Sequence, residues 1–183
     1  MSLDFDEIYS EVAPAIFRYL RRLTASRSQA EDVLQGTFLR FHLQLARETE
    51  IQHYRAWLFR VATNEVRDRR RSEVSSAIRE ESYAAKAEVI DFQSHLENRQ
   101  IVRRVLTHLT PRMKQVLLLS AEGFSYREIA VIADVEAAYV GVLLQRARTA
   151  FKKHFEEDGE RTKKYSEDED EQTEGKKYES RKM

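Results

Sequence analysis

The chain has 183 residues, 42% of them apolar, and its 31 basic and 31 acidic side chains give a formal net charge of zero. It contains no cysteine, which excludes disulfide bonds, thiolate zinc sites and a cysteine nucleophile, and its scarce glycine and proline favour helices. No apolar run approaches the ~20 residues that span a bilayer, and the acidic start is not a secretory signal, so we expect a soluble cytoplasmic protein without membrane insertion.

Three amphipathic helices are predicted in residues 1–72. Apolar residues recur at helical spacing over 5–23, with a kink or restart at Pro14. Residues 28–31 fit a capping box that opens the second helix. A third helix is predicted over 51–71, and the three helices could share one core.

A linker is predicted over residues 73–91, where the periodicity weakens and Ser, Ala and charged residues accumulate. Helical spacing returns over 92–155. Thr110 followed by Pro111 is typical of a helix start, because proline at the first helical position has no N–H to satisfy. Residues 156–183 carry 11 acidic and 7 basic side chains and no aliphatic residue before the terminal Met, which predicts a disordered charged tail.

A helix-turn-helix is predicted in residues 124–150. A capping box over 125–128 opens a short helix, a tight turn follows at 133–135, and a longer helix runs to about Phe155. Such a unit can dock its second helix in a DNA major groove, although an ordinary hairpin in a bundle gives a similar pattern. Basic residues on the second helix favour DNA binding: Arg146, Arg148, Lys152 and Lys153.

Residues 60–71 hold five arginines and only two acidic residues, and Tyr54 and Trp57 precede them. Arginine clusters bind phosphates with release of counterions, and an aromatic ring can stack on an unpaired base. The competing interpretation is a core Trp57 followed by a solvated helix end. The excess of positive charge in residues 60–71 favours the nucleic-acid-binding interpretation.

Signals of catalysis are weak. The five histidines are scattered without metal-ligand spacing, and no phosphate-binding loop, dinucleotide fingerprint or nucleophile elbow occurs. We therefore expect no enzyme activity, metal or cofactor. The acidic residues that begin the helix after residue 30 are explained by the helix dipole, so their pattern alone assigns them no function.

Three stretches in this order resemble the motifs of the extracytoplasmic-function (ECF) sigma factors of the sigma-70 family. They are AEDVLQGTFLR over 30–40, RAWLFRVATN over 55–64 with DRRR over 68–71, and LTP over 109–111 with GFSYREIA over 123–130 and QRAR over 145–148. Order and spacing match across about 150 residues. Each motif is weak alone, whereas the ordered set is highly specific.

The resemblance implies two small helical domains, sigma domain two over residues 1–72 and sigma domain four over 92–155. It implies that the second helix docks on the beta-prime clamp helices of core RNA polymerase, and that domain four meets the beta flap. The residues expected at the clamp helices are Glu31, Asp32, Gln35, Phe38 and Leu39.

The resemblance also implies two promoter contacts. The third helix would read the minus-ten element and hold its non-template strand open, through Tyr54, Trp57, Arg60, Asn64, Arg67, Asp68, Arg69 and Arg71. Domain four would read the minus-thirty-five element, through Ser125, Tyr126, Arg127, Ala138, Tyr139, Gly141, Val142, Gln145, Arg146 and Arg148.

The recognition helix departs from the family pattern. Many members have a Thr-Val-Lys-Ser-Arg-Leu-like segment where this chain has YVGVLL over 139–144, so Gly141 and Leu143 replace the usual basic residues. This predicts a more apolar minus-thirty-five readout, or a weaker dependence on that element. Gly141 in mid-helix costs about 1 kcal/mol relative to Ala, which indicates close approach of some other group.

The sequence thus predicts an alternative sigma factor, monomeric when free, that helps to melt promoters without ATP. Many such factors are held by an anti-sigma factor. Two alternatives stay open: a stand-alone helix-turn-helix regulator that binds duplex DNA without polymerase, and a protein that sequesters a partner through domain two without promoter activity.

Overall fold

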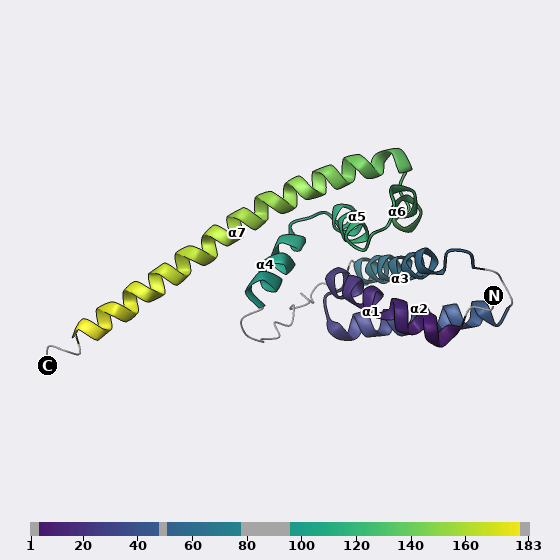
Figure 1. The fold of residues 1–183 in the computed structure, drawn as a ribbon, viewed down its shortest axis with the longest axis horizontal. Coiled ribbons are helices and arrows are strands. Elements are labelled where there is room, and N and C mark those ends of the chain that lie inside the picture. The colour runs from purple at the N-terminus through teal and green to yellow at the C-terminus, as the bar shows by residue number, and fades with distance from the viewer. Residues whose placement is uncertain (1–3, 48–50, 78–95, 180–183) are drawn as a thin grey trace.

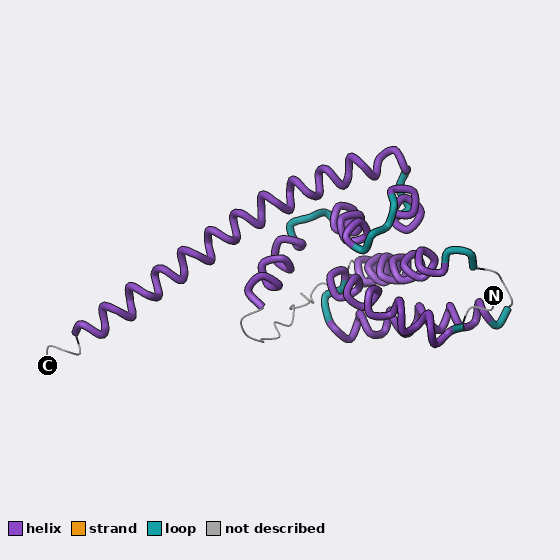
Figure 2. The backbone as a smooth tube through the Cα atoms, viewed as in Figure 1, coloured by secondary structure: helices purple, strands orange, loops and turns teal. Residues whose placement is uncertain are grey.

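The computed structural model describes the backbone of residues 4–47, 51–77 and 96–179. Helices are the only regular secondary structure in these residues, and short loops join them, which confirms the predicted all-α class (Figures 1 and 2). The helices are α1 (Phe5–Leu23), α2 (Arg27–Leu45), α3 (Tyr54–Ala77), α4 (Leu96–Thr107), α5 (Pro111–Ala121), α6 (Tyr126–Ala133) and α7 (Ala137–Glu179). Helices α1–α3 pack on one another as an N-terminal unit, and α4–α7 form a C-terminal unit around α7.

The first helix starts at a side-chain cap. Asp4 is the N-cap of α1, and its carboxylate accepts a hydrogen bond from the Asp6 N–H at 2.9 Å. The helix then continues through Pro14, so the predicted restart does not occur. The buried stripe on both sides of Pro14 packs on the same core, which holds the two halves in one helix despite the missing N–H.

The capping box predicted at Ser28 is wrong by two residues. Ser26 is the N-cap of α2, and its hydroxyl accepts from the Gln29 N–H at 3.1 Å. Both serines are followed three residues later by Gln or Glu, so the pattern fits twice. Glu31, the partner expected for Ser28, instead pairs with Arg27 at 2.7 Å.

The predicted helix starts of the C-terminal unit are confirmed. Thr110 caps α5 with Pro111 in the first turn, and the Ser125–Glu128 capping box opens α6 with both reciprocal bonds present. Asp134 ends α6 in the left-handed conformation, with φ 54°. That conformation, which Asp tolerates better than most residues, makes the tight turn into α7.

Two helices extend further than the sequence predicts. Helix α3 continues to Ala77, and the rest of the predicted linker lies outside the described residues. Helix α7 runs to Glu179 and projects away from the body (Figure 1), whereas we expected an end near Phe155 and a disordered tail. Pairs such as Lys152–Glu156, 3.8 Å apart at i,i+4 spacing, support a helix that buries little, and composition does not separate such a helix from a disordered segment.

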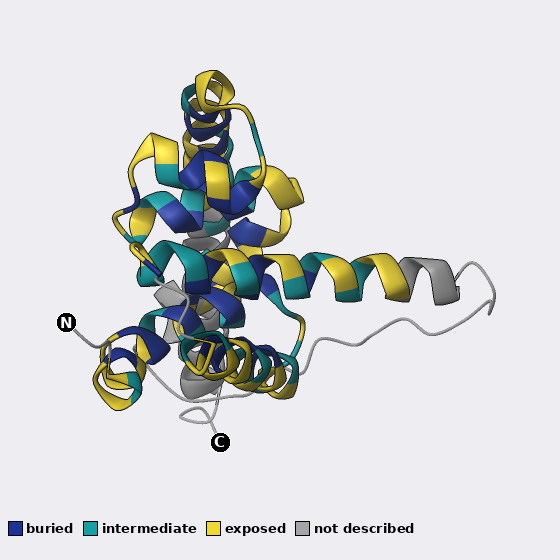
Figure 3. Cartoon of the chain, turned by 90° about the vertical axis from the view of Figure 1, so that its right-hand side faces the viewer, coloured by how far each residue is buried: buried dark blue, intermediate teal, exposed yellow. Residues whose placement is uncertain are grey.

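The two units share one continuous apolar cluster, with buried residues where helices meet and exposed residues on the outer faces (Figure 3). Tyr19 of α1 and Phe59 of α3 are fully buried, with ring centroids 5.2 Å apart. Phe59 also meets Phe124, which precedes α6, edge to face at 4.8 Å. Helix α6 thus lies along α3, and the two units are in direct contact. None of the described helices combines the length and apolar character needed to cross a bilayer.

Candidate nucleic-acid interface

One face of α2 is exposed along its length. Asp32, Gln35, Leu39 and Leu43 follow at i, i+3, i+7 and i+11, so they share one stripe, which we call the α2 stripe. Leu39 is 60% exposed and Leu43 is 51% exposed. These two large apolar side chains on an outer face give a partner protein an apolar surface to cover.

Phe38, predicted for this surface, belongs to the core instead. It is only 3% exposed, and its ring meets those of Tyr9 at 4.7 Å and Phe5 at 6.2 Å. Leu43 was not predicted, although its spacing from Leu39 is the signal that could have found it. On α2, therefore, only the residues on the outer side are accessible to a partner.

Helix α3 also has an exposed stripe. Arg60, Asn64, Asp68 and Arg71 follow at i, i+4, i+8 and i+11 on one side of the helix, and we call them the α3 stripe. The structure gives none of the four a hydrogen bond or ion pair with another described residue. Two guanidinium groups and one amide on this line can bind phosphates and base edges.

The aromatic residues before this stripe are packed rather than free. Trp57 is partly buried, with its ring centroid 5.9 Å from that of Phe41. The Tyr54 hydroxyl donates to Glu11 Oε2 at 3.0 Å. In this conformation Trp57 is mainly a core residue, and neither ring is an open stacking platform.

Arg69 connects α3 to α2. Its Nε donates to Glu65 Oε1 at 3.1 Å, and a second nitrogen lies 3.8 Å from Asp32 of the α2 stripe. Arg40 approaches the same Glu65 carboxylate at 2.6 Å. Burial raises the pKa of Glu65, but the hydrogen bonds from Arg40 and Arg69 outweigh it and hold that pKa below its ordinary value. This network keeps the two stripes in a fixed relation.

Arg67 reaches from α3 to the turn of the helix-turn-helix. It donates to Asp134 Oδ2 at 3.1 Å and to the Ala133 carbonyl at 2.9 Å. Arg112 of α5 donates to the carbonyls of the same two residues, at 2.7 Å to Asp134 and 3.2 Å to Ala133. One turn therefore accepts hydrogen bonds from both units. The guanidinium of Arg67 is occupied by these bonds in this conformation.

A second cross-unit contact surrounds Glu122. Arg55 donates to the Glu122 carbonyl at 2.7 Å, and its guanidinium lies over the Phe124 ring at 4.5 Å. Arg18 of α1 lies 3.6 Å from the Glu122 carboxylate. Of the predicted minus-ten residues, the exposed α3 stripe is open to a ligand, whereas Arg67 and Arg69 are bound within the protein.

The predicted minus-thirty-five residues gather on the outer faces of α6 and α7. The Ser125 side chain caps α6. The other predicted residues are exposed, except Gly141, which is partly exposed. Arg146 donates to the Tyr139 hydroxyl at 3.2 Å, and Arg148 to Ser120 Oγ at 3.4 Å. A Cβ on Gly141 would lie 3.6 Å from Tyr126, which identifies the group that approaches this glycine.

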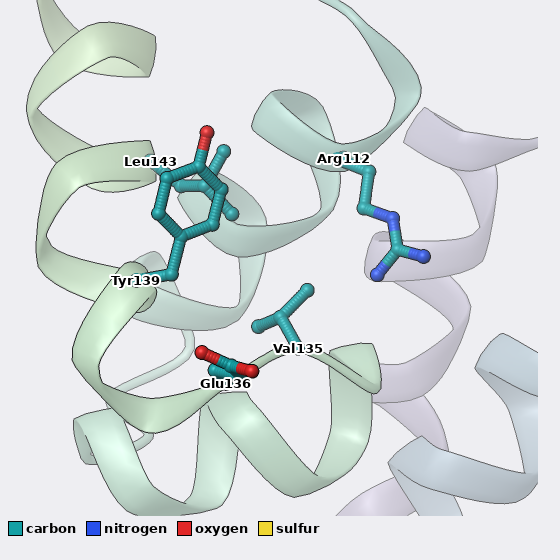
Figure 4. A pocket seen from close by; sticks show the side chains of 5 residues that line it. All are labelled: Arg112, Val135, Glu136, Tyr139 and Leu143. Carbon is teal, nitrogen blue, oxygen red and sulfur yellow. The ribbon is translucent and has the colours of Figure 1, made fainter.

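A shallow cavity of about 440 Å³ adjoins the start of α7 (Figure 4). In Figure 4, Tyr139 and Leu143 line it from α7, with Arg112 across the opening and Val135 and Glu136 from the turn. Its lining is mainly apolar and holds no cluster of convergent polar groups. The cavity therefore extends the apolar surface of the recognition helix.

A positive environment surrounds Lys114 of α5. Burial, followed by the nearby charges of Arg70 and Arg103, lowers the pKa of Lys114 to about 8. Arg70 is itself fixed by a hydrogen bond to the Leu23 carbonyl at 2.6 Å. Like charges from α3, α4 and α5 thus meet where the two units touch.

Two histidines contact each other where the end of α4 meets α7. The rings of His108 and His154 stack at 4.6 Å, and Arg104 lies 3.5 Å from Asp158 beside them. Among the described residues, no group of three His, Asp or Glu side chains could hold a metal ion. The contacts in this region are structural.

Family models match both units. Residues 8–75 match Sigma-70 region 2, and residues 99–151 match Sigma-70 region 4. The chain is 30% identical over 149 residues to the ECF RNA polymerase sigma factor EcfG of Rhodopseudomonas palustris, a match that covers 79% of this chain and 80% of that protein. The chain belongs to the ECF sigma factors. It is thus an alternative sigma factor, of the class that directs RNA polymerase to promoters.

Other relatives agree. RNA polymerase sigma factor CarQ of Myxococcus xanthus is 28% identical over 152 residues, which cover 81% of this chain and 86% of that protein. Sigma factor RpoE of Bartonella quintana, solved in complex with the anti-sigma factor NepR, has the same fold, with a TM-score of 0.69 and 23% identity. That similarity covers 84% of this sigma factor and 97% of the solved chain.

Proposed function

We propose that this sigma factor docks on core RNA polymerase through the α2 stripe and engages the minus-ten element through the α3 stripe. The observation that carries the proposal is the pairing of two exposed stripes of different chemistry on adjacent helices. Leu39 and Leu43 offer an apolar surface for a protein, whereas Arg60, Asn64 and Arg71 offer donors for DNA. The Asp32–Arg69 contact at 3.8 Å couples the two surfaces.

In this proposal residues 1–72 act as sigma domain two and residues 92–155 as sigma domain four. Domain four meets the beta flap and contacts the minus-thirty-five element with the exposed face of α7, as in other helix-turn-helix proteins. Binding energy alone opens the minus-ten region. Unpairing costs a few kcal/mol of lost stacking per base, which contacts along α3 must recover.

Promoter engagement requires the two units to separate. Arg67 is expected to contact the minus-ten element, yet here it donates to the turn at Ala133 and Asp134. The same movement would release Arg55 from Glu122. The closed arrangement is thus the free form, and polymerase and DNA select an open one.

Membership of the ECF sigma factors suggests the remaining properties of the protein. We propose that the free protein is monomeric, that it acts in the bacterial cytoplasm and joins the nucleoid in holoenzyme, and that it catalyses no reaction itself. An anti-sigma factor is a further partner, and the Bartonella quintana complex supports it.

The proposal is tested by titrating fluorescently labelled protein with bacterial core RNA polymerase. We expect tight binding that falls at least tenfold in Asp32→Ala/Gln35→Ala and in Leu39→Asp/Leu43→Asp. Val131→Asp is the matched control, because Val131 is an exposed aliphatic residue on α6, away from α2. Absence of core binding by the folded protein would instead favour a stand-alone DNA-binding regulator.

A separate readout excludes a protein that only sequesters a partner. The sigma factor and core polymerase together are expected to give transcripts from promoter DNA, and neither does so alone. Core binding without any transcript over a randomised promoter library would support sequestration.

A further inference from the structure

The recognition helix separates its apolar residues into two groups. Val140, Leu143 and Leu144 are buried in the core of the C-terminal unit. Val142, at 40% exposure, and Tyr139, at 43%, face outward. Leu143, which replaces a basic residue of the family pattern, therefore cannot read DNA, and Val142 is the outward position.

Val142 lies in a stripe that runs along α7. Ala138, Val142 and Gln145 are exposed and follow at i, i+4 and i+7, so they face the same direction. The first two turns of this helix, residues 137–144, contain no basic residue. In a helix-turn-helix the N-terminal residues of the second helix reach the base edges.

Basic residues lie at the margins of this stripe. Arg146 is directed to the Tyr139 hydroxyl and Arg148 to Ser120, and Arg127 is exposed on α6. Arginines placed beside an apolar stripe match the phosphates that border a major groove. The flanking charge therefore complements DNA on an apolar helix face.

The chemistry of the stripe matches one kind of base pair. Apolar side chains contact the C5-methyl group of thymine, glutamine pairs with adenine N6 and N7, and arginine or lysine is the usual reader of guanine. We propose that Val142, supported by Ala138, determines promoter specificity by contacting a thymine methyl group, and that Gln145 reads an adjacent adenine. The upstream element is thus A·T-rich at these positions. This inference rests on the proposed minus-thirty-five role of domain four.

The test removes one methyl group at a time. Holoenzyme made with the full chain first selects upstream elements from randomised duplexes, and each selected thymine is then replaced by uracil, which lacks only the C5-methyl. We expect one such replacement to weaken wild-type binding about fourfold, the value for one buried methyl-sized group. Val142→Ala holoenzyme is expected to bind the thymine and uracil duplexes equally.

Val131→Ala is the matched control, because it shortens an exposed valine on α6 and should keep the fourfold preference for thymine. A guanine-rich selected element would overturn the inference. So would a methyl effect that persists in Val142→Ala, or affinity that falls equally for thymine and uracil duplexes. Core binding measured in parallel separates these results from failure of the sigma role itself, which would abolish polymerase binding.

Discussion

Arg67 Nη1 and the Asp134 carboxylate lie 3.1 Å apart, although 67 positions separate them in the chain. Arg67 belongs to α3, which is proposed to engage the minus-ten element, and Asp134 ends the first helix of the DNA-binding motif. The side chain of Asp134 is 77% exposed, so this ion pair contributes less than about 1 kcal/mol. The pair therefore shifts the equilibrium between joined and separated units only modestly toward the joined arrangement.

Asp134→Asn is expected to shift the free protein toward the open form by up to about fivefold, because it removes the charge while Asn still tolerates the left-handed conformation. The chain has no cysteine, so single cysteines introduced on α2 and α5 allow the distance between the units to be followed by energy transfer. Asp68→Asn is the control, since Asp68 is exposed on α3 without a described partner. An equal change in both variants would contradict a specific role for Asp134.

Lys114→Met is expected to stabilise the closed protein at pH 7 by about 1 kcal/mol, a value reduced for the partial exposure of Lys114. The folded pKa of about 8 lies below the unfolded value of 10.5, so the unfolded chain binds more protons between these pH values. The destabilisation of the folded protein by the Lys114 charge is therefore complete below pH 8 and declines as the pH rises toward 10.5. Urea unfolding at pH 7 and pH 10 should show the advantage of the variant shrinking.

The exposed Lys153 supplies the comparison for this effect. The difference in free energy of unfolding between Lys153→Met and the wild type should be small and nearly the same at pH 7 and pH 10. A Lys114 variant that behaved in the same way would show that the charge is well solvated.

Gly141→Ala is expected to raise the free energy of unfolding by about 0.5–1 kcal/mol, because alanine has the higher helix propensity. The added Cβ would meet Tyr126 at 3.6 Å, an ordinary contact distance. Gly36→Ala in α2 is the comparison, since its Cβ would meet nothing within 4 Å. Equal gains in urea unfolding would confirm that Tyr126 leaves room, whereas destabilisation at position 141 alone would show that it does not.

Tyr19→Phe is expected to lower the free energy of unfolding by about 1–2 kcal/mol, measured by urea unfolding near pH 7. The Tyr19 hydroxyl and Thr63 Oγ1 are 2.9 Å apart and buried, so the substitution leaves a polar atom without its partner. Burial also raises the pKa of Tyr19 above its ordinary value of 10. Its contribution to stability is thus complete below pH 10 and is lost above it, a loss that the Phe variant should not show.

Local features were predictable because short-range chemistry determines them. The capping box at Ser125, the Thr110 start and the turn at Asp134 each depend on a few neighbouring residues, and all three are present. The prediction of an N-cap at Ser28 was wrong because Ser26 satisfies the same rule two residues earlier. The backbone of α7 continues past the expected end near Phe155, because Lys and Glu favour both solvated helices and disorder.

The assignments that sequence could not give depend on long-range packing. Spacing does not show that Phe38 faces the α1 aromatics, since a helix rich in apolar residues has more than one plausible inner side. Nothing local shows that Arg67 meets a turn in the other unit. The arginines of residues 60–71 divide between internal contacts and an exposed stripe, a division that their spacing in the sequence does not give.

The measurement that tests the central claim most directly is promoter opening. A promoter obtained by selection with the holoenzyme would carry 2-aminopurine in its minus-ten element, whose fluorescence rises when the bases unstack. The sigma role predicts a rise with core polymerase and this protein together, without ATP, that is reduced at least tenfold by Arg60→Ala/Asn64→Ala while core binding is unchanged. A rise without core polymerase, or none with a fully bound complex, would contradict it.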